Sequence, residues 1–137
     1  MDALARWKAR SRGEVTLPSG TTVTIELVAV SAEILAGTFP APVIGLARAM
    51  ESGTADLDHE LTDEEIETAI RYRRIIVARM VRAIEGEEVT LTETDVADLP
   101  VADAEMLWAY HLRLVQLPPR EEAPNPTKSG SKKSPSS

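Results

Sequence analysis

Hydrophobic and polar residues alternate in two stretches near the start of the chain, residues 14–17 and 22–27, with Pro18, Ser19 and Gly20 between them. Alternation with a period of two, rich in β-branched residues and interrupted by proline and glycine, predicts a β-hairpin. Its strands place one set of hydrophobic side chains on a common face: Val15, Leu17, Val23, Ile25 and Leu27. Because a two-stranded hairpin is barely stable alone in water, we expect helices or another chain to cover that face.

After the hairpin the hydrophobic spacing becomes helical. It predicts a short helix over residues 32–36, with Ser31 as the N-cap and Gly37 at its end. An extended turn that contains two prolines follows at residues 39–42, because a residue before proline avoids the helical conformation. A second short helix is predicted over residues 43–50.

The longest predicted helix covers residues 62–85. Its start, Thr62-Asp63-Glu64-Glu65, has the pattern of a capping box, and Gly86 marks its end. Its hydrophobic residues recur at helical spacing: Ile66, Ile70, Val77, Val81 and Ile84. A short extended piece is predicted at residues 89–91. The last predicted helix, residues 101–115, is apolar around much of its circumference, so it belongs either to the core or to an interface.

These elements predict a mainly α protein with a small N-terminal β-hairpin, an α+β fold. We expect a basic N-terminal segment at residues 1–13 and a compact folded domain at residues 14–117. Residues 118–137 contain five prolines, five serines and one hydrophobic residue, so they cannot bury enough apolar surface to offset the entropy lost on ordering. They predict a disordered tail rich in Pro, Ser and Lys.

The composition excludes several classes of protein. The chain of 137 residues has no cysteine, which excludes disulfides, zinc–thiolate sites, iron–sulfur clusters and cysteine nucleophiles. Its net charge is −7, and the acidic part lies before the tail, so we expect no nucleic-acid partner. The chain shows neither a secretory signal nor an apolar stretch of about 20 residues, so we expect a protein that is not secreted and has no membrane partner.

Few residues in the sequence suggest catalysis or metal binding. The loop that begins at Asp56 places carboxylates at the spacing of an EF-hand, but Leu61 stands where that calcium loop needs glycine, and Thr62 is better used as a helix cap. His59 and His111 have no second ligand at metal-binding spacing. No phosphate-binding or nucleophile-elbow motif is present. We therefore predict no catalytic residues, no cofactor and no metal, and a protein that is not an enzyme.

Five arginines crowd the long predicted helix: Arg71, Arg73, Arg74, Arg79 and Arg82. They form either a solvated flank, with Glu67 paired to Arg71 and Glu85 near Arg82, or a surface for a partner protein. Since the chain is acidic overall, we favour the solvated flank.

Three segments carry a resemblance to a known family. They are the hairpin at residues 15–25, the run Ile34-Leu35-Ala36-Gly37-Thr38-Phe39-Pro40-Ala41-Pro42-Val43-Ile44-Gly45-Leu46, and the acidic segment 91–100 that leads into Met106-Leu107-Trp108-Ala109-Tyr110. Together they resemble the tail assembly chaperones of long-tailed (siphovirus-like) bacteriophages. The resemblance implies a protein of the bacterial host cytoplasm that binds the tape measure protein and the tail-tube protein before tail assembly and is absent from the virion. It also implies that a longer, frameshifted form often exists.

Two other functions remain open from the sequence: a virion structural component (head–tail connector or minor tail protein), and a small regulatory protein that uses the arginine-rich helix on nucleic acid. Self-association is also open. As candidate interaction residues we take the hairpin face, Val23 and Ile25, and the last helix, Leu107, Trp108 and Leu112. The sequence does not separate an interaction role for these five from a core role.

Overall fold

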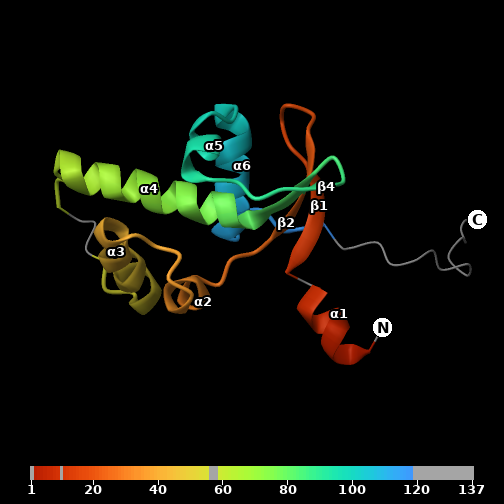
Figure 1. The fold of residues 1–137 in the computed structure, drawn as a ribbon, viewed down its shortest axis with the longest axis horizontal. Coiled ribbons are helices and arrows are strands. Elements are labelled where there is room, and N and C mark those ends of the chain that lie inside the picture. The colour runs from red at the N-terminus through yellow and green to blue at the C-terminus, as the bar shows by residue number, and fades with distance from the viewer. Residues whose placement is uncertain (1, 10, 56–58, 119–137) are drawn as a thin grey trace, which may run out of the picture.

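The computed structural model describes residues 2–9, 11–55 and 59–118, and the fold is α+β (Figure 1). The predicted tail, apart from Pro118, lies outside the described residues. Six helices and four strands are described, in this order: α1 (Ala3–Ala9), β1 (Arg12–Thr16), β2 (Thr22–Glu26), α2 (Val30–Leu35), α3 (Ala41–Ser52), α4 (Asp63–Met80), β3 (Val81–Ile84), β4 (Glu87–Glu88), α5 (Glu93–Ala97) and α6 (Val101–His111).

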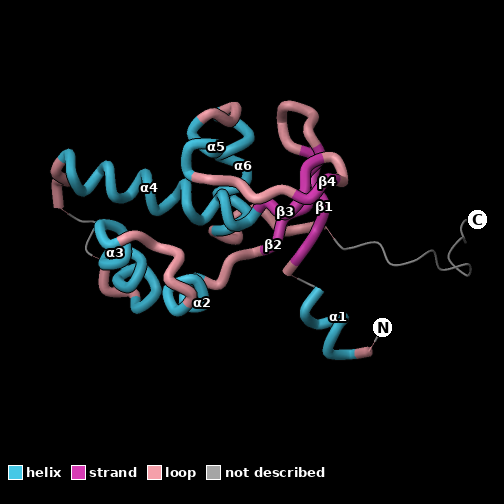
Figure 2. The backbone as a smooth tube through the Cα atoms, viewed as in Figure 1, coloured by secondary structure: helices cyan, strands magenta, loops and turns pink. Residues whose placement is uncertain are grey.

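The predicted hairpin is present as β1 and β2, but it forms only half of a sheet. The sheet has four antiparallel strands in the order β1-β2-β3-β4 (Figure 2). Val15 pairs with Val23, and both side chains point to the buried face as the alternation predicts. Gly20, with a φ of 93°, closes the turn by donating its N–H to the carbonyl of Leu17.

The predicted end of the long helix was wrong. The helix stops at Met80, and Val81 begins β3, which pairs with β2. Val81 and Ala83 are buried while Arg82 is exposed, so the alternation of a strand continues directly from the helical spacing. Glu85 and Gly86 both have positive φ, as in a two-residue type I′ turn, and lead into β4. The extended piece expected at residues 89–91 is therefore found slightly earlier, at Glu87–Glu88.

Other boundaries differ for local reasons. α2 begins at Val30 with Ala29 as N-cap, so Ser31 is not the cap. α3 begins at Ala41, because a proline in the first helical turn has no N–H to leave unpaired. α6 ends at His111 rather than 115, where the chain turns through Arg113 with a φ of 64°. The sequence analysis did not predict α1 or α5.

α4 is the central helix. It packs against the sheet at its C-terminal end, with α2 and α3 on one side and α5 and α6 on the other (Figure 1). Its buried residues all lie in its second half: Tyr72, Ile75, Ile76, Val77, Ala78 and Met80. None of the helices in the described part of the chain is long and apolar enough to cross a bilayer.

Candidate functional site: two grooves beside helix α4

Three of the five candidate interaction residues are core residues. Val23, Ile25 and Leu107 are buried in one hydrophobic cluster, so they offer no surface to a partner. The physical reason is that helices of the same chain cover the sheet face, which removes the need for another chain. Leu112, just after α6, is 44% exposed and is the member of the set that solvent reaches most.

Trp108 is partly buried and belongs to an aromatic cluster within the fold. Its ring meets Tyr72 edge-on at 6.2 Å between centroids, and Tyr72 stacks on Phe39 at 5.7 Å. The guanidinium of Arg73 lies 5.5 Å from the centre of the Trp108 ring, within the range of a cation–π interaction. Burial raises the pKa of Tyr72, to which the nearby Glu51 carboxylate adds. Trp108 therefore joins α4 to α6.

His111 lies beside Trp108, with the two rings 4.9 Å apart. Its Nδ1 atom is buried and has no hydrogen-bond partner among the described residues. Burial lowers the pKa of the imidazole, and the positive charge of Arg113 lowers it further. Burial therefore favours the neutral form of the ring, which packs against Trp108.

The hairpin turn is tied to α6 by a contact that the sequence did not reveal. Asp103 is buried, and its carboxylate accepts hydrogen bonds from the backbone N–H of Ser19 at 2.9 Å and from the Ser19 hydroxyl at 2.5 Å. Asp103 lies in the first turn of α6, where a negative charge favours the helix dipole. This pair is a structural latch between segments that are 84 residues apart.

The arginines predicted as a solvated flank are used mostly within the fold. Arg71 binds Glu93 through two hydrogen bonds of 3.0 Å, and this interaction raises the pKa of Arg71. That pair joins α4 to α5, and the charge of Glu67 adds to the rise in the pKa of Arg71. Two further pairs connect other elements: Arg79 with Glu33 at 3.0 Å, and Arg82 with Glu26 at 2.7 Å. Arg82 lies on β3, so it was wrongly placed on the helix, and Glu85 instead accepts the Thr22 N–H.

No group of three His, Cys, Asp or Glu side chains among the described residues is arranged to hold a metal ion. The first two positions of the EF-hand pattern, Asp56 and Asp58, lie outside the described residues. Thr62 caps α4 in a full capping box with Glu65, as the sequence predicts. The backbone N–H of Thr62, followed by the His59 ring, lowers the pKa of Glu65.

A surface groove of about 610 Å³ lies between α3 and the first half of α4. We call it the α3–α4 groove. Its apolar lining comes from both helices and the loop between them: Pro42, Leu46, Ala49, Ala55, Leu61 and Ala69. Its polar lining contains three glutamates, two threonines and one arginine: Thr54, Glu64, Glu65, Glu67, Thr68 and Arg71. An apolar floor with carboxylates around it suits an apolar segment that carries positive charge.

A second groove, of about 510 Å³, lies between α4 and α5. Ile66 and Ile70, which belong to the hydrophobic residues at helical spacing, line it and remain more than two-fifths exposed. Glu67 and Arg71 line both grooves, so the first half of α4 forms a ridge between them. The two grooves on either side of this ridge are candidate binding surfaces of the protein.

Sequence reasoning missed the α3–α4 groove. The sequence feature that could have indicated this groove is the high alanine content, 18 of 137 residues. Alanine side chains at Ala49 and Ala69, where α3 faces α4, leave the space between the two helices unfilled.

No protein-family model matches the chain, and neither do the curated proteins or the solved structures compared with it.

Proposed function

We propose that this protein is a non-enzymatic tail assembly chaperone of a long-tailed bacteriophage, acting in the bacterial host cytoplasm. In this proposal it binds the tape measure protein and the tail-tube protein during assembly. The resemblance of the three sequence segments supports the family, and the α3–α4 groove is the observation that supports a binding role.

The chemistry of the groove defines the client segment. A helix that presents apolar side chains to Leu46 and Ala49 fits the floor, and lysines or arginines on its flanks would face Glu64 and Glu67. The net charge of −7 attracts such a segment over a longer range and suppresses acidic competitors. A contact confined to one groove favours reversible binding, which a chaperone needs because it must release its client.

The test is co-expression with the candidate tape measure and tail-tube proteins, followed by pull-down through a tag on this chain. An Ala69→Arg variant fills the groove and keeps the helix, because arginine is a good helix former. The matched control is Ala102→Arg, at an exposed position of α6. We expect wild type and Ala102→Arg to retain the tape measure protein, and Ala69→Arg to retain at least about tenfold less, equivalent to a loss of ~1.4 kcal/mol.

Capture of neither client contradicts the proposal. Mass spectrometry of purified particles then tests the structural alternative, because a connector or minor tail protein remains in the virion and a chaperone does not. Equal retention by Ala69→Arg and wild type would leave the chaperone role standing but exclude the α3–α4 groove as its binding site.

A further inference from the structure

The pairing of β2 with β3 contains a shift in register that brings Arg82 to the outer face of the sheet, the face opposite the core. Thr24 pairs with Ala83 and Ile25 with Val81, so Arg82 is an extra residue in β3, as in a β-bulge. Val81 packs in the core, whereas Arg82 and Ala83 both line the outer face. Because bulges re-aim side chains and are common beside functional sites, this face is a candidate for binding.

On that face Arg82 of β3 meets Arg12 of β1. Both guanidiniums contact one oxygen, Oε1 of Glu26 on the strand between them, at 2.7 Å from Arg82 and 3.5 Å from Arg12. Each contact uses a single terminal nitrogen, Nη2, whereas a guanidinium has five N–H donors. Both arginine side chains are 45% exposed. Glu26 therefore holds two cations side by side and cancels the charge of one.

The two arginines line a groove of about 460 Å³, which we call the sheet groove. This volume lies within the ~300–1,000 Å³ of pockets that hold small molecules. The rest of its described lining combines two hydroxyls, two apolar side chains and one carboxylate: Thr24, Thr90, Ala83, Val89 and Glu88. The groove thus offers hydrogen-bond donors for an anion and a small apolar patch beside them.

We propose that the sheet groove binds a small phosphomonoester, with the phosphate group held by Arg12 and Arg82. A phosphate group has three terminal oxygens and close to two negative charges, so it can accept paired hydrogen bonds from two guanidiniums at once. The groove is larger than a phosphate ion, and the space beside Val89 and the two threonine hydroxyls suits a small organic group. This inference goes beyond the proposed function and does not rest on it.

The phosphate of a nucleic acid fits this groove less well. None of the described lining residues is aromatic, so bases find no side chain on which to stack. The net charge of −7 also repels a polyanion, whereas a small molecule meets mainly the local charges of the groove. The observations therefore favour a small ligand.

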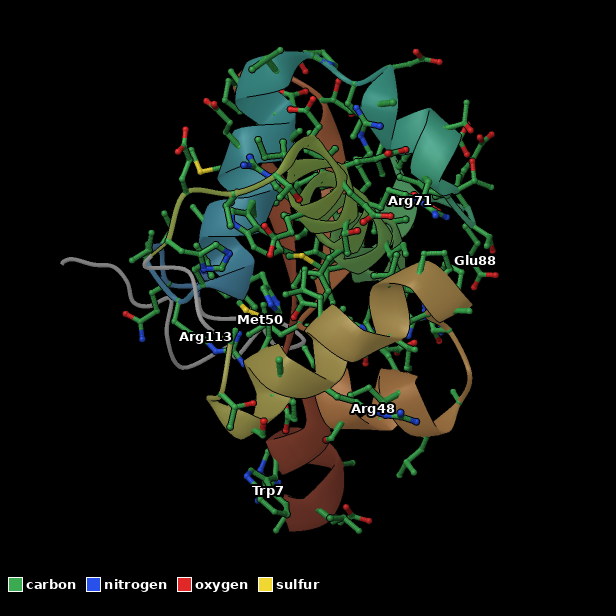
Figure 3. All side chains as sticks on the ribbon, turned by 90° about the vertical axis from the view of Figure 1, so that its left-hand side faces the viewer. Trp7, Arg48, Met50, Arg71, Glu88 and Arg113 are labelled. Carbon is green, nitrogen blue, oxygen red and sulfur yellow. The ribbon has the colours of Figure 1, made fainter. Side chains whose placement is uncertain are left out.

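Glu88 limits the strength of binding. It is exposed, and Figure 3 shows it at the edge of the molecule. Its negative charge opposes that of a phosphate, and together with Glu26 it balances the two arginines, so we expect weak binding that salt weakens further. Removing the charge of Glu88 should therefore strengthen binding, whereas removing either arginine should weaken it. A purely structural role of these residues predicts neither change.

The test is an NMR titration of the isotope-labelled, full-length chain with glycerol phosphate, the smallest suitable probe, at low salt. Sodium chloride at the same ionic strength is the reference. We expect the backbone N–H signals of Thr24, Arg82 and Val89 to shift and to saturate with glycerol phosphate but not with sodium chloride. The signals of α3, at the other end of the molecule, should not shift (Figure 1).

Four variants test the groove. Arg82→Gln and Arg12→Gln should each lower the affinity for glycerol phosphate by about tenfold, because each removes charged hydrogen bonds to the phosphate. Glu88→Gln should raise it by about threefold. The matched control is Arg48→Gln, which removes the same charge from an exposed residue of α3, and Figure 3 shows Arg48 well apart from Glu88. This control should bind like wild type, and the spectrum of each variant without ligand checks its fold.

Several results overturn the inference. The first is a wild-type chain that responds to glycerol phosphate no more than to sodium chloride, and the second is an equal loss of affinity in Arg48→Gln and Arg82→Gln. Binding of inorganic phosphate without binding of glycerol phosphate would show an adventitious ion only. A single-stranded oligonucleotide that shifts the same signals at a lower phosphate concentration would assign the groove to nucleic acid instead. None of these measurements uses a tape measure or tail-tube protein, so a failed titration and a failed pull-down are distinguishable.

Discussion

The latch between Ser19 and Asp103 gives the sharpest test of how the fold is held together. Removing the carboxylate by Asp103→Ala eliminates both hydrogen bonds from Ser19, whereas Ser19→Ala eliminates only the shorter one. Asp103→Asn keeps the shape and an acceptor for the Ser19 N–H, and its amide can donate to the hydroxyl. The three variants therefore remove different fractions of one interaction.

The expected magnitudes follow from the chemistry of the pair. A hydrogen bond to a charged group contributes about 1.5–3 kcal/mol when its partner is buried. Asp103 is buried, but Ser19 is exposed, so water replaces part of what the variant loses. We expect Asp103→Ala to lower the free energy of unfolding by ~2–3 kcal/mol, and Ser19→Ala and Asp103→Asn by ~1 kcal/mol each. A loss of ~2–3 kcal/mol is a large part of the ~5–15 kcal/mol that stabilises a typical domain.

Urea unfolding measures these differences. Trp108 is partly buried and reports the transition by its fluorescence, whereas Trp7 is mostly exposed in the folded state already. An unchanged slope with a lower midpoint shows that stability changed and the unfolding reaction did not. The double variant Ser19→Ala/Asp103→Ala should be no less stable than Asp103→Ala alone. The latch is refuted if the two single losses simply add, or if Asp103→Ala costs less than ~0.5 kcal/mol.

Three further predictions use the same assay. Ile76→Ala should lower the free energy of unfolding by ~2–5 kcal/mol, because this side chain is fully buried. Ile70→Ala on the same helix should lower it by less than ~1 kcal/mol, because that side chain is 44% exposed. Equal losses would contradict the assignment of Ile76 to the core and Ile70 to the groove. Thr92→Ala removes the side chain of the capping box of α5 and should cost ~1 kcal/mol, and an unchanged midpoint would exclude that role. His111 has a lowered pKa when folded, so the unfolded chain takes up its proton first as the pH falls below ~6.5. Stability should therefore fall between that pH and the lower folded pKa, and His111→Asn should reduce this loss; a variant with the wild-type pH profile would contradict it.

Local signals predicted the parts of the fold that depend on neighbouring residues. The hairpin alternation placed Val15 and Val23 on the buried face, and the capping box placed the start of α4 at Thr62. Gly37, with a φ of 75°, follows α2 as expected. Each of these features is set by a few consecutive side chains, so the sequence alone carries enough information.

Features that depend on distant partners were not predictable in the same way. Val77, Val81 and Ile84 have spacing compatible with a helix, and Gly86 is a good helix end. What converts Val81–Ile84 into a strand is pairing with β2, which lies almost 60 residues earlier in the chain. The core position of Val23, Ile25 and Leu107 could not be predicted for a related reason. An apolar side chain such as Leu107 looks the same in the sequence whether its own fold or a partner covers it.

The second half of α4 packs in the core, whereas its first half lines the grooves that we propose for binding. Every buried residue of this helix lies between Tyr72 and Met80, while the half from Asp63 to Arg71 has none and lines both grooves. That first half is held at its ends, by the capping box at Thr62 and by the Arg71–Glu93 pair. Because its side chains contribute little to the core, charge changes on this ridge should alter binding without unfolding the protein. That separation allows the proposed client contact to be tested by mutation without loss of the fold.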